Sequence, residues 1–170
     1  MFWRDKRIHR AALQQAAEKL YDGLIHQARL PVFYTELRVA DTADGRFDML
    51  ALHAFLVLER LGEAGQAALA QALIDRIFAD FEAVMRESGT GDGGIFKNIK
   101  GLASAFYGRL QGYATLRDGA GWRDALRRNL YRGAADAPVE RLARYCLALR
   151  KQLALWLPPA DALDFGPLTP

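Results

Sequence analysis

Cysteine is almost absent from this chain, since Cys146 is the only one among 170 residues. A single thiol cannot close an internal disulfide, which excludes the small secreted proteins that disulfides hold together. Three histidines and one cysteine are also too few for most structural zinc sites, so we expect no bound metal. About half of the residues are apolar and a quarter are charged, which is typical of one globular domain that needs neither kind of cross-link.

Long apolar runs are missing as well. The most apolar stretch, from Met49 to Leu58, has ten residues and contains His53, whereas a helix needs about 20 apolar residues to span a bilayer. No apolar segment of signal-peptide length follows the first residues, which read MFWRDKRIHR. We therefore expect a cytoplasmic protein, and peripheral contact with the cytoplasmic face of the inner membrane stays open.

Strand-like alternation, internal repeats and linkers are also missing, and apolar residues recur with a helical period almost throughout. Helices are predicted at about residues 5–27, 41–58, 63–87, 95–113, 122–131 and 138–156, with an extended segment at 31–40. The second helix begins near Asp41–Asp44 with acidic caps, and its body is apolar all round, which is typical of a helix covered on several sides. The sequence thus predicts an all-α single compact domain of about six helices packed around this central helix, spanning residues 1–157, with a proline-rich irregular tail at 158–170.

Charge is distributed unevenly, although the net charge is only +3. Residues 1–34 sum to +3, residues 35–91 to −5, residues 92–151 to +7 and residues 152–170 to −2. Arginine supplies 18 of the 23 basic residues, and its planar group suits carboxylates, phosphates and carbonyls. The basic segment is compatible with RNA, anionic lipid or an acidic protein, and equally with a merely solvated surface. We do not expect DNA as a partner.

Two strings resemble known ligand-binding motifs, but the residues around or within them exclude those sites. Gly89–Gly94 fits the pattern G-x-G-x-x-G, but a helix precedes it where dinucleotide binding needs a strand, so we expect one helix to end there and the next to be capped by Asp92. The acidic string Asp41–Asp48 lacks the ligand spacing of a calcium loop. Asp44 and Asp48 have the spacing of a carboxylate pair, yet at a helix start they fit the helix dipole better.

His53 and Cys146 are the remaining candidates for catalysis, and neither has a catalytic partner nearby in the sequence. His53 lies on the apolar helix and is interpreted as a hydrogen-bonded core or interface histidine. Cys146 occupies a core position of the last helix and is interpreted as a small apolar residue. Since no nucleophile, metal cluster or phosphate loop is found, we expect a non-catalytic protein without a cofactor.

Uncommon strings occur at or near the expected helix junctions: Arg29–Tyr34, Val39–Leu50 with His53, Met85–Asp92, Ala105–Arg109 with Tyr113, and Arg128–Tyr131. In this order, they resemble the ubiquinol–cytochrome c chaperone family. The resemblance covers roughly residues 20–150. Its most specific parts are D-T-x-D-G-R-F-D at residues 41–48 and R-E-x-G-x-G-D at residues 86–92.

This resemblance implies an assembly factor that binds newly made cytochrome b and helps to build the ubiquinol–cytochrome c reductase. Mitochondrial members act with a small partner protein and near the ribosomal exit, and they carry a targeting extension that this chain lacks, which implies a bacterial, cytosol-facing member. Two other functions stay open. One is an RNA- or ribosome-associated regulator, favoured by the basic segment. The other is an all-α enzyme acting on isoprenoid or lipid-like substrates, whose acidic metal motifs are missing.

Candidate residues for binding a client or partner come from these strings and from the aromatic and charged side chains around them. Arg46, Arg86 and Arg109 are expected to pair with acidic residues at helix starts, and so to brace loops around a groove. Aromatic side chains are expected to line that groove for an apolar helix of the client. The full set of candidates is Tyr34, Asp41, Asp44, Arg46, Phe47, His53, Arg86, Asp92, Tyr107, Arg109 and Tyr113.

Overall fold

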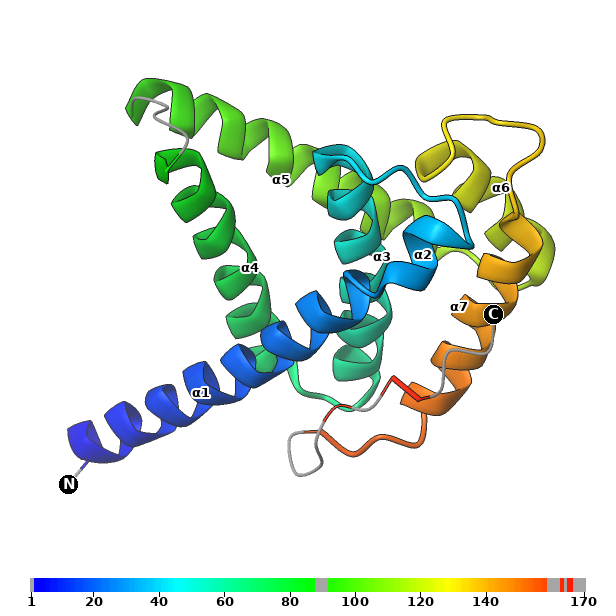
Figure 1. Cartoon of the computed structure of the whole chain (residues 1–170). Helices are drawn as coiled ribbons and strands as arrows, with labels where there is room; N and C mark the ends of the chain where they lie inside the picture. Colours follow the sequence, from blue (N-terminus) through cyan, green and yellow to red (C-terminus); the bar gives the residue numbers. More distant parts are fainter. Residues whose placement is uncertain (1, 88–91, 159–162, 164, 167–170) are drawn as a thin grey trace.

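Figure 1 shows the computed structural model of the chain, which describes residues 2–87, 92–158, 163, 165 and 166, and of residues 2–6 and 92–97 the backbone alone. The described residues form helices and no strand, so the predicted all-α single compact domain is confirmed. The helices are α1 (Phe2–Ala28), α2 (Pro31–Thr35), α3 (Ala43–Glu63), α4 (Ala67–Glu87), α5 (Asp92–Ala114), α6 (Gly119–Asn129) and α7 (Val139–Leu153). None of these described helices is both long and apolar enough to cross a membrane.

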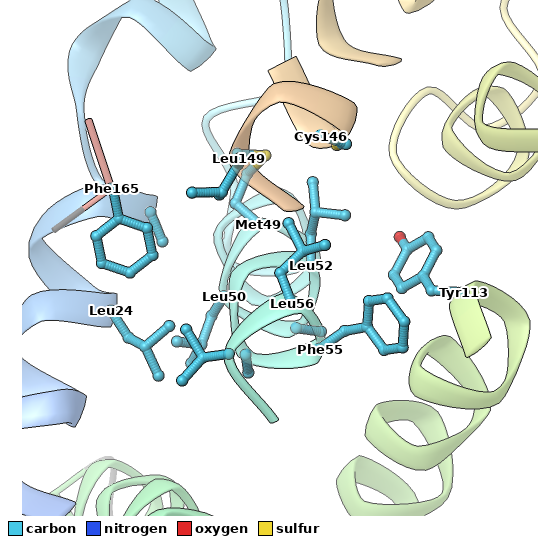
Figure 2. Packing of buried hydrophobic residues seen from close by; sticks show 14 of the residues in the cluster. Leu24, Met49, Leu50, Leu52, Phe55, Leu56, Tyr113, Cys146, Leu149 and Phe165 are labelled. Carbon is cyan, nitrogen blue, oxygen red and sulfur yellow. The ribbon is translucent and has the colours of Figure 1, made fainter. Parts of the chain in front are cut away.

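The central helix is α3, as its all-round apolar body predicted. It contacts α1, α4, α5 and α7, and every residue from Met49 to Val57 is buried. Figure 2 shows side chains from four other segments closing around it, namely Leu24 of α1, Tyr113 of α5, Leu149 of α7 and Phe165 beyond α7. Burying one large apolar side chain stabilises a fold by about 1.5–3 kcal/mol. This shared packing around α3 therefore holds the helices in one domain.

Helices α4 and α5 rise from different parts of the body and converge at the upper left of Figure 1, where the end of α4 and the start of α5 lie close together. We call residues 78–87 and 98–110 the α4–α5 arm. Only Phe106 is buried among the described side chains of the arm, while Phe81 and Leu102 are half-buried. The arm is therefore much less covered by the rest of the chain than α3 is.

Two segments differ from the sequence prediction. Residues 31–35, predicted as extended, form the short helix α2, because proline suits the first position of a helix and Phe33 packs in the core without exposed surface. The turn between α3 and α4 lies at residues 64–66 instead of before Glu63. Gly65 allows it, because its φ of +68° is a conformation that other residues rarely adopt.

Arg150 of α7 links three other segments of the body. Its guanidinium donates to both carboxylate oxygens of Glu59 on α3, at 2.8 and 3.1 Å, and to the backbone oxygen of Leu116 before α6, at 3.1 Å. It also lies 5.2 Å from the ring centre of Trp122 on α6. Because one side chain contacts all these segments, Arg150 fixes α6 and α7 against α3.

The tail predicted at residues 158–170 lies mostly outside the described residues. Its described residues, 158, 163, 165 and 166, are in neither helix nor strand. Phe165 is nevertheless buried, and its ring packs edge-on against His53 with the ring centres 5.8 Å apart. A Cβ on Gly23 of α1 would lie within ordinary contact distance of Leu163 and Phe165, so this part of the tail packs against both α1 and α3.

Candidate functional site

The acidic string that leads into α3 builds the start of that helix. Thr42 caps it, because its Oγ1 accepts a hydrogen bond from the backbone N–H of Gly45 at 3.2 Å. A Cβ on Gly45 would collide with the backbone oxygen of Ala40, so glycine is what lets the preceding chain approach this closely. The prediction of acidic caps at Asp41 and Asp44 is therefore wrong, although Asp44 lies in the first turn, where its charge favours the helix dipole.

Asp48 is a completely buried carboxylate that two arginines hold. Its Oδ1 accepts a hydrogen bond from Nε of Arg109 on α5 at 2.9 Å, and its Oδ2 accepts one from Nη2 of Arg132, between α6 and α7, at 2.7 Å. The arginine side chains are 27% and 50% exposed. A buried charge is tolerated when it is paired and hydrogen-bonded. This ion triad therefore fixes α3, α5 and the α6–α7 connection relative to one another.

A series of aromatic rings runs from the start of α3 along the α4–α5 arm. The ring of Phe47 lies 5.8 Å from that of Phe81, which lies 5.7 Å from Phe78. Phe78 in turn lies 5.7 Å from Phe106 and 6.2 Å from Tyr107, on which it stacks. We call these five residues the arm aromatics. Aromatic pairs of this kind add to the stability of the arm beyond the area they bury.

The arm aromatics adjoin the ion triad and differ in how exposed they are. The guanidinium of Arg109 lies 5.7 Å from the ring centre of Phe47. Phe106 is buried and Phe47 is half-buried, whereas Tyr107 is 44% exposed, and Val84 on the α4 side of the arm is 57% exposed. Exposed apolar side chains gain free energy when a partner covers them. The arm therefore offers a surface suited to an apolar partner.

Helix α5 has glycine at three positions near this surface. A Cβ on Gly101, Gly108 or Gly112 would meet no atom within 4 Å, so packing against the described fold does not require glycine there. Glycine inside a helix costs about 1 kcal/mol relative to alanine. Glycines on a helix surface let another helix approach its backbone closely, and Gly108 directly follows Tyr107.

His53 lies on another side of α3, in a buried hydrogen-bonded chain. Its Nδ1–H donates to the backbone oxygen of Met49 at 2.8 Å, and its Nε2 accepts from the hydroxyl of Tyr145 on α7 at 2.7 Å. The same hydroxyl oxygen accepts a hydrogen bond from Nε2 of Gln27 on α1 at 3.0 Å. These bonds use both ring nitrogens of the neutral imidazole, and burial lowers its pKa to about 4. His53 is thus a core histidine, as interpreted from the sequence.

Comparison with known proteins identifies the family to which the chain belongs. The model of the family described as ubiquinol-cytochrome C chaperone matches residues 35–156, which contain the ion triad and all the arm aromatics. The chain belongs to the ubiquinol–cytochrome c chaperone family. The crystal structure of the Cbp3 homolog from Brucella abortus is similar over 97% of this chain and 98% of that chain, with 31% identity and a TM-score of 0.80. No curated protein matches the chain.

In this ubiquinol–cytochrome c chaperone, five of the sequence candidates come together around the start of α3 and the arm. They are Asp41, Arg46, Phe47, Tyr107 and Arg109. The predicted pairing of arginines with acidic residues is found twice among them, at Arg46 with Asp41 and at Arg109 with the buried Asp48.

Other candidates lie elsewhere in the chaperone. His53 and Tyr113 have no exposed surface, so the expectation that they face a client does not hold in this fold. Tyr34 is half-buried and its hydroxyl donates to a backbone oxygen at the end of α1 at 2.7 Å. Arg86 is exposed in the last turn of α4. The side chain of Asp92 and the glycine string before it lie outside the described residues, and so does the pairing predicted for Arg86 there; α5 itself begins at Asp92.

Sequence reasoning missed two members of the site. Arg132 binds Asp48 across 84 positions of sequence and has a left-handed φ of +51°, and no spacing rule predicts either property. Phe78 connects Tyr107 to Phe81, and the sequence patterns did not single it out. One signal was available: an aspartate inside an apolar helix, between Phe47 and Met49, needs a cation when it is buried.

The chemistry of the described residues is suited to binding. They contain no group of three or more His, Cys, Asp or Glu side chains able to hold a metal ion. Burial raises the pKa of the Cys146 thiol far above its usual range, so the nucleophilic thiolate is disfavoured. Both nitrogens of His53 are engaged in the core. What the site presents instead is apolar surface beside fixed charges.

The buried state of His53 predicts a loss of stability in mild acid. In the unfolded chain its pKa returns to about 6.5, so between pH 6.5 and 4 the unfolded state binds more protons than the folded state. The contribution is fully present above pH 6.5 and is lost as the pH falls. We expect the free energy of unfolding to drop by about 2 kcal/mol between pH 7 and 5, as measured by urea titration.

Two histidine variants isolate this effect. His53→Gln is expected to flatten the pH dependence in that window, whereas His26→Gln, at an exposed position of α1, should leave it unchanged. An equal acid dependence in the wild type and His53→Gln would show that other groups cause it.

Arg46→Ala is expected to have a small effect on stability. The pair of Arg46 Nε with Asp41 Oδ1 is short, at 2.7 Å, but both side chains are 57% exposed. Exposed ion pairs contribute about 0–1 kcal/mol. Chemical denaturation should therefore show little or no destabilisation; a large loss of stability would mean that Arg46 braces more than this pair.

Proposed function

We propose that this chain is a non-catalytic assembly chaperone that binds newly made cytochrome b and assists assembly of the ubiquinol–cytochrome c reductase. Its family and its likeness to the Cbp3 homolog from Brucella abortus support this proposal. The structural observation that carries the binding role is the exposed end of the arm aromatics, at Tyr107, together with Val84 across the arm.

The arm is suited to a transmembrane helix that has not yet met its final partners. Such a helix gains by covering apolar surface, and Tyr107 and Val84 present that surface. Because Gly108 and Gly112 carry no side chain, a helix can approach the backbone of α5 closely there. Because Arg46 and Arg109 at one end of this surface are already paired with Asp41 and Asp48, the loops of the client would meet balanced charges there. The client would be released when its contacts with other subunits of the reductase replace its contacts with the arm.

The chaperone acts, in this proposal, at the cytoplasmic face of the inner membrane, where its client is inserted. Binding without catalysis agrees with a site made of aromatic rings and charges that are already paired. Recognition then depends on the shape and apolarity of the client more than on any single reactive group.

The alternative of an RNA- or ribosome-associated regulator rests on the net charge of +7 in residues 92–151. In the structure, many arginines of this segment are already bound to carboxylates: Arg109, Arg123, Arg132, Arg141 and Arg150. Paired arginines attract phosphate less than free ones. This pairing favours the client-binding function over the RNA-binding function.

The function is tested by removing the protein from cells. Without it, cytochrome b should still be synthesised, while the assembled ubiquinol–cytochrome c reductase, measured by native electrophoresis, should be lost. Returning the wild-type chain should restore the complex. Normal amounts of assembled reductase in the deletion strain would contradict the proposal.

A further inference from the structure

We infer that the first three turns of α1 are a membrane-contact element that binds the surface of an anionic lipid bilayer. This inference rests on the proposed function and deepens it, because it assigns a surface to the peripheral membrane contact. It concerns a part of the molecule far from the arm aromatics and is argued from different residues.

The start of α1 projects from the body of the protein. Figure 1 shows its N-terminal half extending past the other helices, while its C-terminal half packs against α3. Every described side chain from Arg7 to Ala12 is exposed, and Ile8 is 61% exposed. Continuous packing begins only at Leu13 and Ala17, where α1 meets α4. The first three turns are thus a helix with little support from the rest of the chain.

Such a segment is held as a helix only by its own backbone hydrogen bonds and by the packed half of α1 that it continues. An exposed isoleucine adds an apolar group that the fold does not cover. A surface that binds this segment would therefore also stabilise its helical form.

The composition of the segment identifies the kind of surface. The first ten residues contain four basic residues, one acidic residue and an aromatic pair at Phe2 and Trp3. Arg7 and Arg10 are exposed, and no described carboxylate pairs with them. Tryptophan prefers the boundary between water and lipid, and clustered basic residues are attracted to anionic headgroups. Charge complementarity and the aromatic pair together point to an anionic bilayer.

Tryptophan emission gives a direct readout of this contact. Of the three tryptophans, Trp122 and Trp156 are buried in the body, so a blue shift on adding vesicles reports Trp3 in α1. We expect the shift with vesicles of phosphatidylcholine mixed with phosphatidylglycerol and little with phosphatidylcholine alone. Trp3→Phe should abolish the shift while vesicle binding, followed by co-sedimentation, is retained.

A matched pair of double variants tests which charges matter. Arg7→Ala with Arg10→Ala should weaken binding to the anionic vesicles by about 25-fold, since each basic residue near such a surface contributes about fivefold. Arg128→Ala with Arg144→Ala removes the same charge from exposed positions of α6 and α7 and should change binding by less than about threefold. Equal loss in both variants, or equal binding to neutral vesicles, would overturn the inference.

The remaining outcomes separate this inference from other partners and from the proposed function. A blue shift that depends on protein concentration without vesicles would assign the segment to a second copy of the chain. If the wild type binds RNA and the double variant Arg7→Ala with Arg10→Ala does not, the segment would be assigned to nucleic acid. Capture of cytochrome b in detergent, where no bilayer exists, should be unaffected in the α1 double variant. Failure of vesicle binding alone would thus leave the chaperone function standing.

Discussion

Replacing Asp48 by asparagine should lower the free energy of unfolding by about 3–5 kcal/mol. The carboxylate is completely buried and accepts hydrogen bonds from Arg109 at 2.9 Å and from Arg132 at 2.7 Å. Asparagine keeps the size of the side chain but removes the charge, so the two guanidinium groups, which are 27% and 50% exposed, lose the anion that both of them bind. For a chain of this length, the loss corresponds to a fall in Tm of roughly 6–20 °C.

Calorimetry or chemical denaturation measures this effect against two further variants. Asp44→Asn, one turn earlier on α3 at an exposed position, should change stability by less than about 0.5 kcal/mol. Adding Arg109→Met to Asp48→Asn should recover part of the loss, because one unpaired cation is removed as well. If Asp48→Asn remains within about 1 kcal/mol of the wild type, the ion triad does not hold α3, α5 and the α6–α7 connection together.

Replacing Tyr107 by alanine should raise the Kd for cytochrome b by about 5- to 150-fold, the effect of losing 1–3 kcal/mol at an interface hot spot. Tyr107 is 44% exposed and stacks on Phe78, so it is both accessible to a client and held in position. Aromatic residues held in this way often dominate binding. The measurement is a titration of purified cytochrome b in detergent with the wild type and the variant.

Folding and specificity need their own controls. Circular dichroism should show the helical content of Tyr107→Ala unchanged, and Tyr107→Phe should bind within about threefold of the wild type because the ring remains. Leu155→Ala removes a side chain that is 83% exposed after α7, outside the arm, and should leave the Kd unchanged. Full affinity in Tyr107→Ala, with loss in Leu155→Ala, would move the client site away from the arm.

The helical period predicted most of this fold because apolar side chains recur on one face of each helix. The all-round apolar run from Met49 to Val57 also identified the central helix, since only a helix surrounded by others can bury every side. The short helix α2 was missed for a tertiary reason. Its five residues are too few to show a period, and burial of Phe33 decides their conformation.

The sequence predicted which types of residue form the candidate site better than it predicted which residues pair with one another. Arginine–carboxylate pairs were expected near the start of α3, and Arg46 with Asp41 is such a local pair, five positions apart. The partners of Asp48 lie 61 and 84 positions away, and only the packing of α5 and the α6–α7 connection brings them together. Tyr113 shows the converse limit, because the string that contains it did not reveal that it is buried, whereas the position of His53 on the apolar helix did indicate a core or interface histidine.

Affinity capture of the tagged wild-type chain from native membranes of growing cells tests the central claim most directly, with cytochrome b and RNA quantified in the captured material. The account predicts that cytochrome b is strongly enriched over an untagged control, and that it stays bound after ribonuclease treatment and washing in high salt. Capture of ribosomal RNA without cytochrome b, released by salt as phosphate contacts require, would contradict it.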